Sequence, residues 1–134
     1  MASPLGAGLT KPILEAMNVV FPPDDPATAE IAVDPYLQNT LGALQGGVVA
    51  ILMESAAERL ATSILAGIVR TRGLELQYLK LGRKGPIFAR ARVLARTPAG
   101  LVARVELFDR GDADALLTVA TVWLERAGPF DLSD

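Results

Sequence analysis

A proline-free, largely apolar segment between Gly46 and Ala66 constrains the fold of this chain more than any other feature. Its apolar residues are distributed on all sides of a helix, which is typical of a helix that is buried on most of its surface. At 1.5 Å per residue such a helix is roughly 30 Å long, which is the span of a small domain. Gly67 supplies a suitable end. We therefore expect one central helix with a sheet wrapped around it.

The chain after Arg70 is typical of β-strands joined by turns that contain glycine and proline. Four strands are predicted there, over residues 71–81, 86–97, 100–109 and 115–126. A short first strand is predicted over Glu30–Asp34, because Pro35 favours extended geometry in the residue before it. Short connections favour antiparallel pairing, and a single long helix after the first strand makes the fold class α+β rather than α/β.

Apolar residues alternate with arginines along the strand predicted at 86–97. A period of two places the two sets on opposite faces of the sheet, so the apolar set should cover the helix and the other face should be partly solvated. The apolar set is Ile87, Ala89, Ala91, Val93 and Ala95, and it continues in Leu101, Ala103, Val105 and Leu107. The arginines between them are Arg90, Arg92 and Arg96.

The length and composition fit a single domain, because 134 residues with 51% hydrophobic content can bury one core but leave no room for a second. Residues 1–28 are expected to form a lead-in that packs on the domain and holds a short helix over roughly Lys11–Met17. Residues 29–128 should form the domain itself, and residues 129–134 a tail.

The chain contains no cysteine and no histidine, which limits its chemistry. Disulfides, thiolate nucleophiles and sulfur-ligated metals are excluded, and so are the commonest general base and the commonest zinc ligand. Acid-base chemistry must then fall mainly to carboxylates. Asp112 and Asp114 lack the remaining ligands of a calcium loop and suit a polar hairpin turn, so no metal is expected.

The hydropathy and charge of the chain limit its location and partners. No window reaches the roughly 18 apolar residues of a membrane span, and the N-terminus lacks a signal core, so a cytoplasmic protein without a membrane partner is expected. A pI of 5.1 argues against nucleic-acid binding. Residues 70–110 nevertheless hold ten basic and three acidic residues, about +7, which suits a small ligand that bears phosphates. A solvated sheet face is the alternative explanation.

The start of the long helix and an acid within it are the best candidates for a functional site. Gly46 and Gly47 open the helix, where unpaired N–H groups and the positive dipole end favour an anion or a polarised carbonyl oxygen. Glu54 follows among apolar residues, where an ionised carboxylate is costly unless it is paired or functional. Glu58 lies one turn further, beside Arg59, and a solvated charge cluster is its alternative role.

The segment Asn39-Thr-Leu-Gly-Ala-Leu-Gln-Gly-Gly47, followed by Glu54, resembles the loop and helix of hotdog-fold acyl-CoA thioesterases. The phenylacetate-pathway and 4-hydroxybenzoyl-CoA types are the most similar. The resemblance covers roughly residues 28–126 and includes Leu76–Lys80 with the downstream Gly85. It implies a hotdog fold and hydrolysis of an acyl-CoA to a carboxylic acid and free coenzyme A, with no cofactor beyond the CoA of the substrate.

The same resemblance implies roles for individual residues and an assembly. The catalytic roles of the family fall on Asn39, Gly46 and Glu54. The family forms dimers with two sheets joined edge to edge and with paired sites at the interface, which implies a homodimer or a dimer of dimers. Further candidates for substrate binding are Gln45, Gly47 and Glu58, and candidates for the CoA phosphates are Arg83, Lys84, Arg90, Arg92 and Arg96.

Gln45 is a departure, because the family usually has His-Gly-Gly where this chain has Gln-Gly-Gly. Glutamine can hydrogen-bond to a thioester but cannot usefully exchange a proton near neutral pH, and it could simply hold the loop. Two alternatives follow: a hotdog protein that binds an acyl thioester or lipid-like ligand without turnover, and a structural dimerisation domain. A hotdog hydratase is disfavoured because such sites usually rely on a histidine.

The spacing of Gly46 and Glu54 predicts a site shared between subunits. Eight residues of helix separate them by about 12 Å along the axis. An oxyanion donor and an attacking group must converge within about 3 Å of the reacting group, so the two contributions should come from different chains. The acyl group cannot be inferred at this level. Possible pocket liners, with the core as the alternative, are Met53, Phe88, Phe108 and Trp123.

Overall fold

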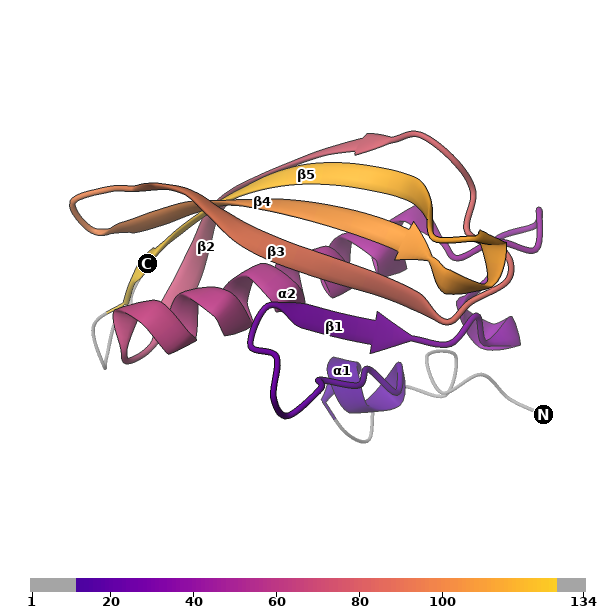
Figure 1. The fold of residues 1–134 in the computed structure, drawn as a ribbon. Helices are drawn as coiled ribbons and strands as arrows, with labels where there is room; N and C mark the ends of the chain where they lie inside the picture. The colour runs from indigo at the N-terminus through magenta and orange to yellow at the C-terminus, as the bar shows by residue number, and fades with distance from the viewer. Residues whose placement is uncertain (1–11, 128–134) are drawn as a thin grey trace.

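The computed structural model describes residues 12–127 and has one long helix, α2 (Gly46–Leu65), packed against a curved sheet (Figure 1). Gln45 precedes the helix in extended geometry, with φ −64° and ψ 145°. The helix ends where Ala66 and Gly67 both adopt positive φ, at 51° and 124°. The helix predicted from the apolar segment is therefore confirmed, and a pair of left-handed residues rather than Gly67 alone ends it.

The sheet has five antiparallel strands in the order β1-β3-β4-β5-β2, which confirms the α+β class. In this order β1 and β2 form the two edges of the sheet. The connections from β1 to β2 and from β2 to β3 cross the sheet, whereas β3, β4 and β5 are neighbours both in sequence and in the sheet. The strands are β1 (Thr28–Ile31), β2 (Val69–Tyr78), β3 (Ile87–Arg96), β4 (Gly100–Asp109) and β5 (Ala115–Arg126). A one-turn helix, α1 (Ile13–Ala16), lies below β1 in Figure 1.

The core lies between α2 and the sheet face that is turned toward it. Alanines on both surfaces, among them Ala56, Ala57, Ala89 and Ala103, are completely buried and let the helix approach the sheet closely. Leucines and valines fill the remaining space, and each one fully buried contributes about 1.5–3 kcal/mol. Among residues 12–127 no helix is both long and apolar enough to cross a membrane.

The bounds of the first two strands differ from the prediction. β1 covers Thr28–Ile31, the residues that pair with β3, rather than residues 30–34, and the Asp34 carboxylate accepts a hydrogen bond from Tyr36 N (2.9 Å) at the start of a 3-10 turn over Pro35–Leu37. β2 ends at Tyr78 rather than at residue 81, because Leu79 N and Lys80 N both donate to Leu117 O. Of the helix predicted over residues 11–17, Ile13–Ala16 is helical and Lys11 lies outside the described residues.

The predicted alternation in β3 holds only as far as Ala91. A bulge between Val93 and Ala95 shifts the register with β4, and Val93 is 36% exposed where a core position was expected. Val93 precedes the shift and pairs in register with the buried Ala103, so its exposure shows that the end of β3 extends beyond the packed core, and the bulge displaces only the residues after it. The apolar positions predicted in β4 are all buried, as expected.

Candidate active site at the start of the central helix

The N-terminus of α2 presents free backbone donors to an open surface. Val49 N donates to Gln45 O, so the N–H groups of Gly46, Gly47 and Val48 precede the first acceptor that the helix can offer them. Gly46 and Gly47 are exposed, and the Gln45 side chain makes no capping bond. A developing oxyanion or another anion would meet both the donors and the positive end of the helix dipole here.

The Asn39 side chain organises the loop that leads into the helix. Its Oδ1 accepts hydrogen bonds from Leu41 N (2.8 Å) and Ala43 N (3.2 Å), and its own backbone N donates to Ala43 O (2.7 Å). The carbonyl oxygen of the amide is thus occupied, whereas residues 12–127 offer no hydrogen-bond partner to Nδ2. Toward a ligand, Asn39 can therefore act as a donor.

Gln45 makes the contact expected of a residue that holds the loop. Its Nε2 donates to Gln38 O (3.2 Å), and its backbone N donates to Leu37 O (2.9 Å). The side chain remains exposed, and its Oε1 is left as an acceptor. The structure thus brings Asn39, Gln45 and Gly46 together around the first turn of α2.

A cavity of about 310 Å³ opens beside this turn, between α2 and one end of the sheet. Asn39 and Gly46 both line it, and Tyr78 closes one side by donating from its hydroxyl to Gly46 O (2.8 Å). Tyr78 was not predicted as a site residue, although it lies within the segment Leu76–Lys80 that carried part of the resemblance. The other lining residues are Leu44, Val49, Leu79, Lys80, Leu81, Gly82, Leu107, Leu117 and Thr118.

Glu54 and Glu58 lie further along α2 and do not line this cavity. Both are half-buried, and Glu58 Oε1 accepts a hydrogen bond from Thr71 Oγ1 on β2 (3.2 Å). Burial raises the pKa of Glu58, the negative charge of Glu54 raises it further, and the Thr71 bond partly opposes the shift. The next residue of β2, Arg72, forms an ion pair with Glu125 instead. Thr71 is therefore the residue of β2 that contacts the pair of helix acids.

Replacing Glu58 by glutamine should stabilise the protein more at neutral than at acidic pH. Because the pKa of Glu58 is raised in the folded state, the folded protein keeps a proton that the unfolded chain releases, and the free energy of unfolding falls as pH rises through that window. Glutamine removes this loss and can still accept the Thr71 bond. In thermal melts, the advantage of Glu58→Gln over the parent should grow from about pH 4 to about pH 7. A difference that stays constant with pH would contradict this account.

The loop of residues 82–86 is tied to the Asn39 loop. Arg83 Nε donates to Leu41 O (3.2 Å), and Leu44 N donates to Gly82 O (3.1 Å). Arg83 and Lys84, two of the five predicted phosphate contacts, are exposed in this loop, and the preceding Gly82 lines the cavity. Asp109, which was not anticipated, fixes this loop.

The Asp109 carboxylate is only 1% exposed and accepts three backbone hydrogen bonds. Oδ1 accepts from Gly85 N (2.7 Å) and Gly111 N (3.1 Å), and Oδ2 accepts from Lys84 N (3.1 Å). These bonds join the 82–86 loop to the end of β4. A buried carboxylate held in this way has no periodic signature in sequence, which is why sequence reasoning missed it.

Replacing Asp109 by alanine should destabilise the protein by at least about 2 kcal/mol, because it leaves three backbone donors without their acceptor. That loss should lower the melting temperature by roughly 5–10 °C. The matched control is Asp112→Ala, since Asp112 is a partly exposed residue of the same turn that pairs with the exposed Lys80. The control should melt close to the parent, and equal melting of both variants would contradict the proposed role.

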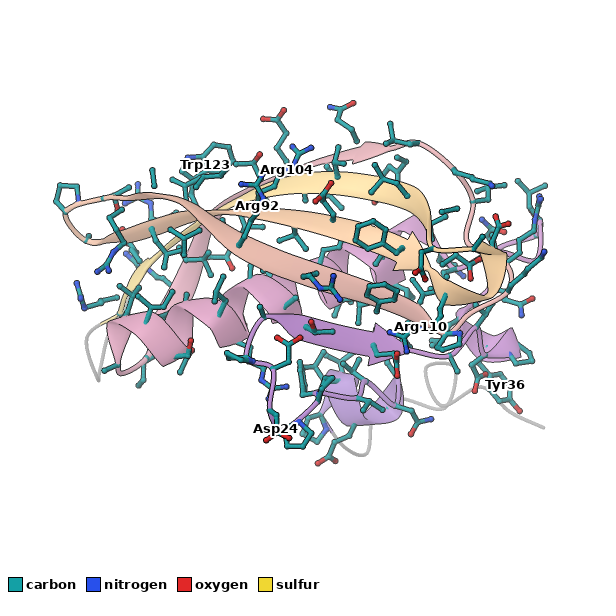
Figure 2. All side chains as sticks on the ribbon, viewed as in Figure 1. Asp24, Tyr36, Arg92, Arg104, Arg110 and Trp123 are labelled. Atoms are coloured by element: carbon teal, nitrogen blue, oxygen red, sulfur yellow. The ribbon has the colours of Figure 1, made fainter. Side chains whose placement is uncertain are left out.

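Several predicted residues lie away from the cavity. Arg90 is on the sheet face opposite α2, where its Cζ lies 5.4 Å from the centre of the Phe88 ring. Figure 2 shows Arg92, Arg104 and Trp123 gathered on the same outer face. The four predicted pocket liners do not line the cavity. They are Met53, which is buried in the core, Trp123, which is 38% exposed, and the aromatic residues Phe88 and Phe108. Among residues 12–127 no three acids are grouped to hold a metal ion.

The sequence profile of the thioesterase superfamily matches residues 41–116. No curated protein sequence matches the chain significantly. Among solved structures, a candidate esterase from Mycobacterium tuberculosis superposes with a TM-score of 0.77 at 24% identity, covering 89% of this chain and 100% of that one. AziG from S. sahachiroi has a TM-score of 0.76 at 25% identity, with 87% and 96% covered. A Bacillus halodurans protein solved with CoA has a TM-score of 0.71 at 16% identity, with 84% and 74% covered.

These likenesses agree with the five-stranded sheet wrapped around one long helix, the hotdog architecture that the loop and helix residues had predicted. The superfamily profile begins within the Asn39 loop, includes all of α2 and extends into β5. It therefore covers the first turn of the helix and both helix acids, and it spans more than half of the 134 residues. The chain belongs to the thioesterase superfamily.

Proposed function

We propose that this protein hydrolyses an acyl-CoA thioester at a site shared by two subunits. The observation that carries the proposal is the junction of Asn39 and Gly46 at the mouth of an apolar cavity, with Glu54 about 12 Å along the same helix. Membership of the thioesterase superfamily supports thioester hydrolysis in general. The CoA bound to the Bacillus halodurans protein of the same fold is consistent with a CoA ester as substrate.

In the proposed reaction, the thioester carbonyl oxygen accepts a hydrogen bond from Gly46 N, at the positive end of α2. Glu54 takes a proton from a water molecule, and the water oxygen bonds to the carbonyl carbon. Alternatively, the Glu54 carboxylate attacks that carbon directly. In either case the carbon–sulfur bond breaks and coenzyme A leaves as the thiolate. With water as the attacking group the acid forms in this step, whereas direct attack leaves the acyl group on Glu54 as a mixed anhydride, which a water molecule then cleaves to the carboxylic acid and the free Glu54 carboxylate. Asn39 donates through Nδ2 to position the substrate or the water.

The second subunit is required by the distance between Gly46 and Glu54, and the edge of the sheet offers a place for it. β2 pairs with β5 on one side and has no neighbouring strand on the other among residues 12–127. Such an unpaired edge is a template for a second strand. Pairing of β2 with its copy across a two-fold axis would place two α2 helices antiparallel, so that Glu54 of one subunit approaches Gly46 of the other.

The exposed cations of the 82–86 loop suit the phosphates of coenzyme A. Arg83 is anchored to Leu41 O by Nε, which leaves its terminal nitrogens free to donate to a phosphate. Lys84 is adjacent and exposed. Arg90 is not included in this part of the proposal, because it lies on the far face of the sheet.

Release of free thiol from short, long and aromatic acyl-CoAs tests the proposal directly. Turnover of at least one ester, lost in Glu54→Gln, is the expected result. Absence of thiol release across the panel would overturn it. Gln45, which takes the place of the usual histidine, favours one alternative function, binding of an acyl thioester without turnover. That function predicts a rise in melting temperature with acyl-CoA but no thiol release.

A further inference from the structure

Thr118 places a free hydroxyl inside the apolar cavity. The residue is 1% exposed, and its side chain has no hydrogen-bond partner among residues 12–127. Among residues 12–127, Arg59 Nη1 is the side-chain polar atom that is both inaccessible to solvent and without a hydrogen-bond partner. Thr118 Oγ1 also has no partner but does not belong to this class, so it must be accessible from open space. The space that Thr118 lines is the 310 Å³ cavity. The hydroxyl is therefore available to donate a hydrogen bond to a ligand in this space or to accept one from it.

The position of Thr118 relative to the reacting end follows from the strand register. Tyr78, Thr118 and Leu107 are direct neighbours across β2, β5 and β4. The Cβ atoms of such neighbours lie about 5 Å apart, and the tyrosine hydroxyl reaches Gly46 O at 2.8 Å. The side chain of Tyr78 therefore spans the distance from the strand position beside Thr118 to the first turn of α2.

The rest of the cavity wall is predominantly aliphatic. Five leucines form its largest part, and its other polar groups belong to Asn39, Gly46, Tyr78 and Lys80. A volume of 310 Å³ corresponds to roughly ten non-hydrogen atoms, if each occupies about the space of a water molecule. The cavity is therefore large enough for a short or medium acyl group, or for one with a single ring.

We propose that this cavity holds the acyl group and that Thr118 selects acyl groups carrying a hydroxyl or keto oxygen several bonds away from the thioester. The inference rests on the proposed hydrolysis, because it places the thioester carbonyl at Gly46. The acyl chain then runs past Tyr78, along the leucines, and its remote oxygen hydrogen-bonds to Thr118 Oγ1. Thr118 is a specificity residue in this account and does not touch the reacting atoms.

The test compares hexanoyl-CoA with 5-hydroxyhexanoyl-CoA and 6-hydroxyhexanoyl-CoA. One neutral hydrogen bond should raise kcat/KM for the better hydroxylated ester about tenfold over hexanoyl-CoA in the parent. Thr118→Val keeps the shape of the side chain and should abolish this preference, whereas Thr118→Ser should retain it. The control is Thr121→Val, since Thr121 lies on the same strand but pairs with Arg104 on the outer face.

Melting shifts with the same three esters separate failure of this inference from failure of the proposed function. If the parent hydrolyses none of the esters but is stabilised more by a hydroxylated one, and Thr118→Val loses that difference, the selectivity stands and hydrolysis is wrong. If all the esters are hydrolysed at equal kcat/KM, or the preference survives in Thr118→Val, the selectivity is wrong and hydrolysis stands. If the parent shows neither turnover nor a melting shift with any of them, both are overturned.

Discussion

Replacing Glu54 by glutamine should reduce acyl-CoA hydrolysis by about a hundredfold or more while leaving the fold unchanged. The amide has nearly the shape of the carboxylate but can neither accept a proton from water near neutral pH nor attack a thioester. Glu54 is half-buried on α2 between buried residues, so a side chain of the same size preserves the packing. Removal of its charge also relieves the electrostatic effect on Glu58.

Thiol release at saturating acyl-CoA measures this loss, and size-exclusion chromatography checks that the assembly is retained. The matched control is Glu106→Gln, because Glu106 is also half-buried but lies on β4, paired with Val119 and Arg90. It should hydrolyse the same ester at the rate of the parent. If Glu54→Gln retained the rate of this control, Glu54 would not be the attacking group or the base.

The elements with strong periodic patterns could be predicted from the sequence, and those that depend on pairing between strands could not. The apolarity of Gly46–Leu65 on every side indicated a buried helix, and the helix is present with nearly the expected bounds. The alternation in β3 failed after Ala91, because the end of the strand extends beyond the packed core and then carries a bulge, and both depend on tertiary structure rather than on local periodicity. β2 ended early because two N–H groups turn toward Leu117 O, a contact between residues nearly 40 positions apart.

Some residues of the candidate site could likewise be predicted from the sequence, and others could not. Asn39, Gln45 and Gly46 are close in sequence, and their meeting at the first turn of α2 follows from local geometry. Tyr78 and Thr118 were missed because they reach the site from different strands, and only the register shows that they are neighbours. Asp109 was missed because its partners are backbone groups, which leave no trace in residue type.

The side of the sheet on which Arg90 lies could have been predicted from the sequence itself. Arg90 lies between Ala89 and Ala91, which the alternation already placed on the helix side of the sheet. The same period of two therefore directs Arg90 away from the first turn of α2, and the structure agrees. Arg83 and Lys84 are in a turn, where no periodicity applies, so their place beside the Asn39 loop required the structure.

Replacing Gly46 by proline should reduce hydrolysis by about 100-fold to 1,000-fold relative to Gly46→Ala, because proline removes the N–H that polarises the thioester carbonyl. Gly46 is the first residue of α2, where proline is favoured, and Gln45 already has the extended geometry that a residue before proline requires. Both variants add a Cβ, which would lie 3.2 Å from the Tyr78 hydroxyl, so crowding is common to the pair. Equal rates in the two variants would show that the N–H is not used.

The Gly46→Pro and Glu54→Gln variants together test whether each site is built from two subunits. In a mixed dimer, one site pairs an intact Gly46 with an intact Glu54 from the other chain, and the second site lacks both groups. The two variants, carrying different tags, are expressed together and purified through both tags. Although each variant alone is inactive, the mixed dimer should therefore have about half of the activity of the unmodified protein. If Gly46 and Glu54 acted within one chain, every site in the mixed dimer would lack one of them, and no activity would return. Recovery of thiol release would thus establish the shared site without any structure of the complex.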